Sequence, residues 1–501
     1  MHVKIPQEVK DIARKLEMNN HKAFLVGGCV RDLLLKREPK DWDVATDAKP
    51  EVVQKLFIES VYENKFGTVG VKTRSADDRL KVVEITTFRI EGKYSDKRHP
   101  DEVKFAKTIN EDLSRRDFTI NAIALELNSA RGREHRPDDL LLSHDLQIVD
   151  PYEAQADLKI KSIRAVGNPQ ERFEEDALRL LRAVRFAVEL GFDIEKETAE
   201  AIKQKAPLLE FIAKERIRDE MVKMIMAERA AEGIIMLEDL RLLQFVMPEL
   251  REGIGCGQNK HHIYTVFDHN TRALNYAAEK GYSLVVRLAS LLHDVGKPRT
   301  KRGEGLDSTF YSHEMVGARM ATQILDRLHF SKELVEAVSH LVRCHLFYYN
   351  VGEVTAAGVR RFLARVGSEN IDDLIKVREA DRIGSGVPKA IPYKIRHLLF
   401  MIEKVKHDPV HPKMLKLRGD DVMRILGINP SPRIGAILLV LLEEVLDDPK
   451  KNIVEFLEQR VKELGLLSDN ELDELAVKAR ERKEEFEGGI EEDMKKKHHV
   501  K

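Results

Sequence analysis

The sequence predicts an α+β protein, with an N-terminal domain that mixes strands and helices and helical domains after it. Runs rich in β-branched residues with period-two alternation occur before the turn signal Asp150-Pro151 and become rare after it. Beyond that turn, apolar residues recur with the period of a helix. The 501 residues suffice for three or four domains and a terminal segment. We expect the boundaries 1–150, 151–255, 256–390 and 391–465, followed by a charged, flexible C-terminus at 466–501.

Composition narrows the class of protein. The 84 Lys and Arg residues nearly balance the 85 Asp and Glu residues, so contacts with nucleic acid must come from local basic patches. The three cysteines show no CxxC spacing, which fits reduced thiols rather than a disulfide framework. The N-terminus shows no signal-peptide pattern, and no apolar run reaches the ~18 residues of a membrane span. We therefore expect a cytoplasmic protein that does not contact the membrane.

A Gly-rich turn follows the first predicted strand. Phe24 to Val26 form an apolar run that ends at Gly27-Gly28, and Arg31 follows in a segment with helical character. A strand that enters a helix through such a turn directs backbone N–H groups toward an anion, and a guanidinium adds a planar fork for phosphate. Gly28 and Arg31 are therefore candidate ligands of a triphosphate, although a turn without phosphate explains the same residues.

Two carboxylates follow this turn. Residues 41–45 (DWDVA) alternate as a strand does, which puts Asp41 and Asp43 on one face with Cα atoms about 6.6 Å apart. Carboxylates at this spacing can share one or two Mg²⁺ ions. Solvated acids at a strand end are the alternative. Glu84 is a third carboxylate in a β-rich segment, and it fits a metal site and a strand edge equally well.

The next segment contains a loop and a charged run. Residues 89–100 (RIEGKYSDKRHP) break the periodicity and predict a loop. In residues 115–125 (RRDFTINAIAL), Asp117 and Asn121 are four positions apart. On a helix they would share a face and could reach a ribose hydroxyl, whereas Asp117 as a helix N-cap explains the spacing as well.

Residues 172–192 predict one amphipathic helix that ends at Gly191. One flank carries a charge at every third position: Asp176, Arg179, Arg182 and Arg185. A solvated, ion-paired face is the ordinary explanation of such a row. The alternative is a pair that reads a base, because a carboxylate accepts from an exocyclic amine while a guanidinium donates to the neighbouring ring nitrogen. Cytosine and adenine present that pattern, and guanine and uracil do not.

The third segment has the residues of a metal site. The candidate ligands lie in several stretches of helical character: His269, His293, Asp294, His313, His345 and Asp381. Such ligands can converge on a divalent cation from separate helices and leave open positions for a hydrolytic water. An isolated buried histidine more often belongs to a core, which is our interpretation of His340.

The Gly27-Gly28 turn, the aspartate pair, the RRDFTINA run and the EDALRLLRAVRF segment occur in the order found in class II tRNA nucleotidyltransferases. Residues 20 to about 465 resemble the CCA-adding enzymes of bacteria. The resemblance implies a head of polymerase-β type at 1–150 and a neck and body at 151–255 for nucleotide selection and RNA binding. It further implies an HD domain at 256–390 and a tRNA-binding tail at 391–465.

The resemblance also implies roles for individual residues. Asp41 and Asp43 would be catalytic and hold Mg²⁺, and Gly28 and Arg31 would bind the triphosphate. The remaining nucleotide-binding residues would be Arg116, Asp117 and Asn121 at the ribose and phosphate, Asp176 and Arg179 at the base, and Arg182 and Arg185 beside it. His269, His293, Asp294 and Asp381 would bind a divalent metal in the HD domain.

The implied activity is the addition of CCA to the 3′ end of tRNA from CTP and ATP, with release of pyrophosphate and with phosphohydrolase activity at the HD site. The loop at 89–100 resembles the flexible loop of enzymes that add all three nucleotides. A bacterial poly(A) polymerase is one alternative. The other is an HD phosphohydrolase whose N-terminal half only binds nucleotide or RNA.

Overall fold

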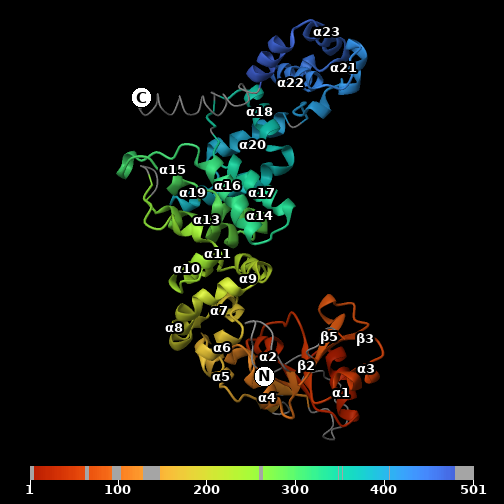
Figure 1. Ribbon diagram of the computed structural model, residues 1–501, viewed down its shortest axis with the longest axis vertical. Helices are drawn as coiled ribbons and strands as arrows, with labels where there is room; N and C mark the ends of the chain where they lie inside the picture. The colour runs from red at the N-terminus through yellow and green to blue at the C-terminus, as the bar shows by residue number, and fades with distance from the viewer. Residues whose placement is uncertain are drawn as a thin grey trace. The chain divides into compact units, whose positions relative to one another are not determined.

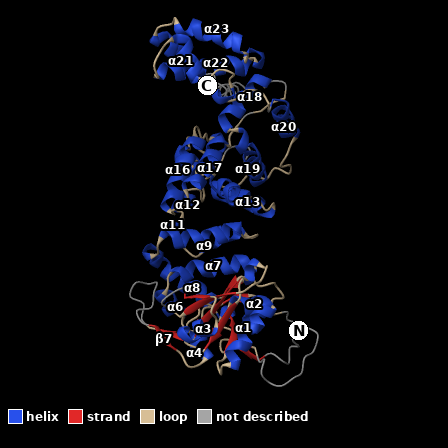
Figure 2. Ribbon diagram, turned by 90° about the vertical axis from the view of Figure 1, so that its right-hand side faces the viewer, coloured by secondary structure: helices blue, strands red, loops and turns tan. Residues whose placement is uncertain are grey.

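The computed structural model describes residues 5–62, 67–92, 103–127, 147–258, 263–347, 349–351, 354–405 and 407–479. The chain divides into two compact units, one of residues 1–251 with 327–330 and one of residues 252–326 with 331–501 (Figure 1). All the named strands lie in the first unit, and the second unit is helical (Figure 2). The α+β prediction is therefore confirmed, while the finer domain boundaries stay predictions.

A mixed sheet of seven strands forms the head of the first unit. Its order is β3 (Ser60–Tyr62), β4 (Thr68–Lys72), β5 (Val82–Thr87), β2 (Asp43–Thr46), β1 (Ala23–Val26), β8 (Ala124–Glu126) and β9 (Gln147–Val149). Among the described strands of this sheet, only β2 and β5 pair in parallel, with Asp43 opposite Glu84. The parallel pair therefore puts these two carboxylates at the same level of the sheet.

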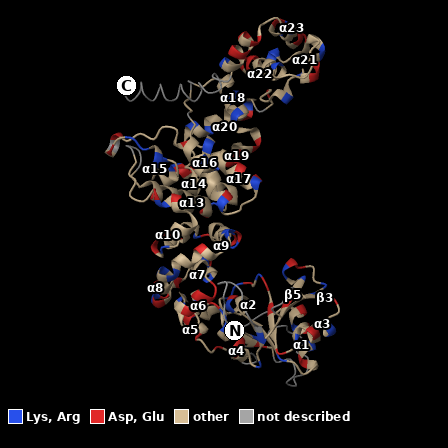
Figure 3. Ribbon diagram, viewed as in Figure 1, with Lys and Arg blue, Asp and Glu red and all other residues tan. Residues whose placement is uncertain are grey.

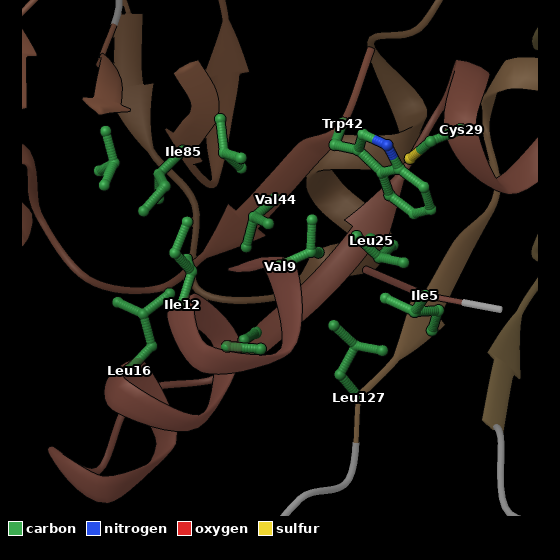
Figure 4. Close-up of a cluster of buried hydrophobic side chains, with 14 of the residues drawn as sticks. Ile5, Val9, Ile12, Leu16, Leu25, Cys29, Trp42, Val44, Ile85 and Leu127 are labelled. Atoms are coloured by element: carbon green, nitrogen blue, oxygen red, sulfur yellow. The ribbon is translucent and has the colours of Figure 1, made fainter. Parts of the chain in front are cut away.

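Alternate residues of β1 face two different cores. Leu25 lies in one cluster with Val9 and Leu16 of α1 (Gln7–Met18), which Figure 4 shows packed against the sheet. Phe24 and Val26 lie in the other cluster, on the side of α4 (Ile109–Ser114). Side chains of a strand alternate between faces, so a sheet covered on both sides needs this continuous apolar run. The sheet is thereby fixed between helices, and its carboxylates are presented from a rigid strand.

Short helices and strands complete the first unit. They are α2 (Gly28–Leu34), α3 (Pro50–Leu56), α5 (Ala154–Ile160), α6 (Pro169–Glu175), α7 (Leu178–Leu190), α8 (Lys196–Lys205), α9 (Lys214–Met226), α10 (Ala230–Asp239), α11 (Leu243–Val246) and α12 (Pro248–Arg251), with the strand pairs β6 (Arg89–Glu91) and β7 (Val103–Phe105), and β10 (Ser162–Ile163) and β11 (Asp193–Ile194).

Two local predictions were wrong. The single helix expected at 172–192 is two helices, α6 and α7, because Asp176 has extended backbone angles (φ −135°, ψ 104°) and its carboxylate accepts from the backbone N–H of Leu178. The first part of the loop expected at 89–100 is a strand, β6, which pairs with β7. Residues 93–102 lie outside the described residues.

The second unit consists of helices. They are α13 (Val266–Glu279), α14 (Leu284–Leu292), α15 (Lys297–Thr300), α16 (His313–Arg327), α17 (Lys332–Cys344), α18 (Ala356–Val366), α19 (Ile371–Gly384), α20 (Tyr393–Val405), α21 (Gly419–Leu426), α22 (Pro432–Asp447) and α23 (Val454–Gly465). Within the segment predicted to be flexible, residues 469–479 are helical and bury Leu472, and residues 480–501 lie outside the described part. None of the described helices is long and apolar enough to span a membrane.

Candidate functional site

The turn between β1 and α2 has the geometry expected of an anion-binding loop. Gly27 has a positive φ of 75°, which side chains disfavour, and it precedes the first turn of α2. A Cβ at Gly27 would lie 2.5 Å from Nη1 of Arg116, so glycine is what allows this guanidinium to approach the turn. The structure therefore brings Arg116 to the triphosphate site predicted from Gly28 and Arg31, which we call the cradle.

The two aspartates lie at the start of β2. The strand begins at Asp43, and Asp41 precedes it, but Trp42 between them is buried and the predicted alternation of faces is kept. Burial raises the pKa of Asp43, and Asp41 adds to this, whereas Arg116 acts in the opposite direction. Clustered carboxylates with a raised pKa are the kind of oxygen ligands that a divalent cation would neutralise, so the residues fit a Mg²⁺ site.

Four predicted residues form one chain of hydrogen bonds. Nη1 of Arg31 donates to Oδ1 of Asn121 at 2.8 Å, and Nδ2 of Asn121 donates to Oδ1 of Asp117 at 3.3 Å. Arg182 of α7 donates to the other oxygen of Asp117 through Nε (2.8 Å) and Nη2 (2.5 Å). The cradle on α2 is thus tied to the helix α7 by direct contacts.

The local structure around Asp117 is neither the helix expected for Asp117 and Asn121 nor a helix with Asp117 as its N-cap. A short 3₁₀ turn occupies Thr119–Asn121, with Phe118 rather than Asp117 at its N-cap. The turn is held from outside the segment, because the Thr119 hydroxyl donates to Oδ2 of the buried Asp157 at 2.5 Å. Asp117 and Asn121 meet across this turn instead of along a helix.

The ion pair between Asp117 and Arg182 gives a stability prediction. Burial of Asp117 would raise its pKa, but Arg182, with smaller effects of Arg179 and Asn121, outweighs burial and holds the pKa below the usual value. Such a carboxylate stabilises the fold above the pKa of the unfolded chain, and this stabilisation is lost as the pH falls through the folded-state pKa. Arg182→Gln should therefore lower the free energy of unfolding by about 3 kcal/mol at pH 7, since it leaves a buried charge unpaired.

Denaturant titration at several pH values measures this effect. The unpaired Asp117 of the variant should have a raised pKa and take up a proton on folding, so the difference from wild type should narrow as the pH falls from 7 toward 4. A difference that stays constant over this range would show that the charge of Asp117 is not its cause.

Asp176 and Arg179, the expected base-reading pair, lie next to the hydrogen-bond chain that contains Asp117. Nη2 of Arg179 donates to the backbone carbonyl of Arg115 at 3.2 Å, and its Nη1 contacts Glu175 at 2.6 Å. The Asp176 carboxylate accepts from both Nη atoms of Arg216 on α9, at 3.4 and 3.1 Å. In this structure each member of the pair therefore has a protein partner, and the partner of Asp176 comes from another helix.

Three arginines surround the ring of Phe186. The guanidinium carbons of Arg31, Arg182 and Arg185 lie 5.4, 5.2 and 4.1 Å from its centroid. Nε of Arg185 also lies 2.6 Å from Glu220 of α9. The ring therefore gathers basic groups from α2 and α7 on one side of the head.

Sequence reasoning missed the partners supplied by α9. Neither Arg216 and Glu220 nor Phe186 was singled out from the sequence. Arg216 and Glu220 are four positions apart and therefore lie on one face of α9. Nothing in the sequence indicated that this face would lie against α7.

A second cluster lies in the other unit. The ligand atoms of His269, His293 and Asp381 lie within 4.8 Å of one another, and those of Asp294, His313 and His345 do the same. All six side chains are buried. The structure thus brings together the four predicted ligands and the two additional histidines.

Asp294 lies between the two groups. Its Oδ2 is 3.2 Å from Nε2 of His269 and 3.4 Å from Nε2 of His293, while its Oδ1 is 3.3 Å from Nε2 of His313 and 3.6 Å from Nε2 of His345. One carboxylate could therefore bridge two cations, each of which would have imidazole nitrogens as further ligands.

Backbone contacts orient the imidazole rings. The Nδ1 atoms of His293, His313 and His345 hydrogen-bond the carbonyls three residues upstream, at 2.7 to 2.8 Å. Each Nε2 is therefore directed at the aspartates. In metal sites, a ligating histidine is oriented in the same way, by a hydrogen bond of its other ring nitrogen. A Cβ at Gly296 would lie 2.3 Å from the carbonyl oxygen of His313, so glycine permits the close approach of the two backbones.

The charges in this cluster favour a cation. Burial opposes protonation of His293, but Asp294 and Asp381 raise its pKa to about 10. Burial instead lowers the pKa of His345 to about 4, which keeps this ring neutral. Lys297, which the sequence reasoning missed, is buried with Nζ 2.6 Å from Oδ2 of Asp294. Protons and ammonium groups balance the aspartates here, and a divalent metal could take over that role.

Comparison with known families agrees with both clusters. The family model described as the poly A polymerase head domain matches residues 23–164. A second model, described as a probable RNA- and SrmB-binding site of polymerase A, matches residues 191–254, and the HD domain model matches residues 266–385. HD domains generally use divalent metals, which fits the buried cluster of the second unit.

Similar proteins cover nearly the whole chain. The A-adding tRNA nucleotidyltransferase of Deinococcus radiodurans is 34% identical over 84% of this chain and 91% of its own length. The CCA-adding enzyme of Enterococcus faecalis is 31% identical over 90% of this chain and 95% of its own length. Among solved structures, the Bacillus stearothermophilus CCA-adding enzyme in complex with CTP matches with a TM-score of 0.65 and 26% identity, covering 91% of this chain and 96% of its own. The chain therefore belongs to the tRNA nucleotidyltransferase family that includes the CCA-adding enzymes.

Proposed function

We propose that this protein adds C, C and A in turn to the 3′ end of tRNA, using CTP and ATP and releasing pyrophosphate. The observation that carries the proposal is that residues 115–117 connect the Gly27 turn to the base-reading pair. The guanidinium of Arg116 lies beside Gly27, the backbone carbonyl of Arg115 accepts from Arg179, and Asp117 pairs with Arg182. Two relatives, an A-adding tRNA nucleotidyltransferase and a CCA-adding enzyme, support the substrate class. Because tRNA and both nucleotides are cytoplasmic, we propose that the protein acts there.

In the proposed site, Asp41 and Asp43 would hold Mg²⁺, which lowers the pKa of an attacking hydroxyl and neutralises charge on the triphosphate when bound. Gly28, Arg31 and Arg116 would bind the triphosphate from the cradle side. Arg116 is suited to this because its guanidinium lies beside Gly27, where Nη2 is also 3.6 Å from Oδ2 of Asp112. Asn121 and Asp117 would position the ribose while they hold Arg31 and Arg182 in place.

Base choice would be made by Asp176 and Arg179, with Arg182 and Arg185 beside the nucleotide. A carboxylate beside a guanidinium can pair with the amine and ring nitrogen of cytosine or adenine, and it leaves guanine and uracil with unpaired or repelled groups. We propose that Arg216 holds the Asp176 carboxylate in the orientation that this reading needs. The head at 1–150, the neck and body at 151–255 and the tail at 391–465 would then supply transfer, selection and tRNA contacts.

One assay tests the proposed function against its alternatives. The purified protein is incubated with tRNA transcripts that end before CCA, after C, or after CC, with each labelled NTP alone and with CTP and ATP together, and the products are sequenced. We expect all three transcripts to end in CCA and to grow no further. Extension of only the CC-ended transcript would identify an A-adding enzyme, and long A tails would identify a poly(A) polymerase.

The base-reading pair gives a separate prediction. Arg179→Ala should reduce discrimination against UTP and GTP by about 5- to 150-fold, the range expected for one bidentate base contact. Arg216→Ala should act in the same direction more weakly, and Arg216→Lys should restore part of the loss. Arg218→Ala, on the same helix but paired with Asp219, is the matched control and should leave discrimination unchanged. Discrimination against UTP and GTP that stays at the wild-type level in Arg179→Ala and Arg216→Ala would disprove base reading by this pair.

We also propose a metal-dependent phosphohydrolase site in the HD domain. The observation that favours it is the pair of buried ligand groups that share Asp294. Ionised carboxylates and neutral imidazoles are the forms that bind metal, and bound metal lowers the pKa of a water that attacks phosphate. Activity on a phosphomonoester or a cyclic phosphate should depend on added divalent metal, and EDTA should remove this activity. Nucleotide addition is assayed separately, with and without Mg²⁺, to report on the head.

A further inference from the structure

One face of α20 carries exposed aromatic side chains. The helix packs on α18 and buries Ile395, Leu398 and Val405. On the opposite face, Tyr393 is 61% exposed and Phe400 is 63% exposed. Exposed aromatic side chains gathered on one face, rather than scattered singly, are typical of interaction sites.

The aromatic side chains form a row with a histidine between them. The ring of His397 lies 6.0 Å from the ring centroids of both Tyr393 and Phe400. A 2.5 Å hydrogen bond between the Tyr349 hydroxyl and Nδ1 of His397 fixes the middle ring. Tyr393 and Phe400 are seven positions apart on the helix, so the row extends over about 10 Å. The row is therefore long enough to contact more than one base.

Basic residues accompany this row. Residues 389–405 contain Lys389, Lys394, Arg396 and Lys404 but a single acidic residue, Glu403. Arg396 follows Tyr393 by three positions and Lys404 follows Phe400 by four, so both lie beside the rings on the same face. Among the described residues, neither has an acidic partner within ion-pair distance, and Figure 3 colours the basic residues of α20 blue.

We infer that Tyr393, Arg396, His397, Phe400 and Lys404, which we call the α20 stripe, bind the tRNA substrate; this inference rests on the proposed function. Aromatic rings stack on nucleobases without regard to sequence, and neighbouring cations bind the phosphates. A symmetric contact between two copies of the stripe would bring Arg396 and Lys404 near their own copies, and like charges oppose that arrangement. RNA offers bases that stack on the rings and phosphates that bind the basic side chains.

The test measures binding of a fluorescent tRNA transcript that ends before CCA over a series of KCl concentrations. The double variant Y393A/F400A should bind about 10- to 100-fold more weakly, with an unchanged slope of log K against log salt. The double variant R396Q/K404Q should instead reduce that slope by about 1.5, because two phosphate contacts are lost. In the nucleotide-addition assay, the KM for tRNA should rise in both variants while the KM for CTP stays constant.

Matched controls come from elsewhere in the same unit. Leu466 is 88% exposed and Lys332 has an 85% exposed side chain, so L466A and K332Q remove comparable surface groups and should bind tRNA as wild type does. Thermal unfolding and HD phosphatase activity check that each variant is folded. Wild-type affinity in both α20 variants would overturn the inference while leaving the proposed function intact. A changed oligomeric state with unchanged tRNA binding would also overturn it, by assigning the stripe to contacts between copies.

Discussion

Replacing Asp43 by Asn is expected to lower the rate of nucleotide addition at least about 1,000-fold, because the site loses a charge needed to bind Mg²⁺. The variant keeps the size and hydrogen-bonding shape of the side chain at the start of β2. Since burial raises the pKa of Asp43, its ionised form costs stability at neutral pH. Asp43→Asn should therefore unfold at the same temperature as wild type or at a slightly higher one. Loss of activity without loss of stability distinguishes a catalytic role from a structural one.

Asp47→Asn is the matched control for this change. Asp47 follows the other end of β2, where it contacts Nδ1 of His21 at 3.2 Å and the backbone N–H of Lys22 at 2.9 Å. This variant should retain nucleotide addition close to the wild-type rate. If Asp43→Asn kept more than a tenth of the wild-type activity, the assignment of the catalytic carboxylates would be wrong.

Replacing Asp294 should remove the metal-dependent phosphatase activity by at least about 100-fold and leave nucleotide addition unchanged. Asp294 contacts four imidazoles, so its loss affects both groups of ligands at once. Asp294→Ala would also leave the buried ammonium of Lys297 without its counter-charge, which is expected to cost about 3 to 5 kcal/mol of stability.

Because Asp294→Ala risks unfolding the domain, His313→Gln and His345→Gln provide a second test. Each removes one ligand from the group that contains Asp294 without unpairing Lys297. Metal content by mass spectrometry and phosphatase activity should fall together in these variants. Full phosphatase activity in a folded His313→Gln/His345→Gln protein would exclude this group from the hydrolytic centre.

Local patterns predicted the features that depend on neighbours in sequence. The Gly27-Gly28 turn follows a strand and opens α2, as the switch from an apolar run to a helical pattern indicated. The alternation around Trp42 put two aspartates on one face, and the structure keeps that face even though the strand begins at Asp43. His293 and Asp294 follow the apolar helix α14 as the sequence suggested.

The errors came from contacts between distant segments. A uniform helical period hid the break at Asp176, because the interruption depends on one side chain that binds the N–H two residues later and is held by Arg216 of α9. The 3₁₀ turn at Thr119 depends on Asp157, which lies 38 residues further along the chain. Lys297 and the bridging position of Asp294 likewise needed the packing of the helical bundle.

A crystal structure with CTP and Mn²⁺ tests the central claim most directly. The account predicts an anomalous Mn²⁺ peak between Asp41 and Asp43, the triphosphate on the Gly28–Arg31 cradle, and the cytosine edge paired with Asp176 and Arg179. Nucleotide bound with its base away from Asp176 and Arg179, or a Mn²⁺ peak away from the two aspartates, would contradict it.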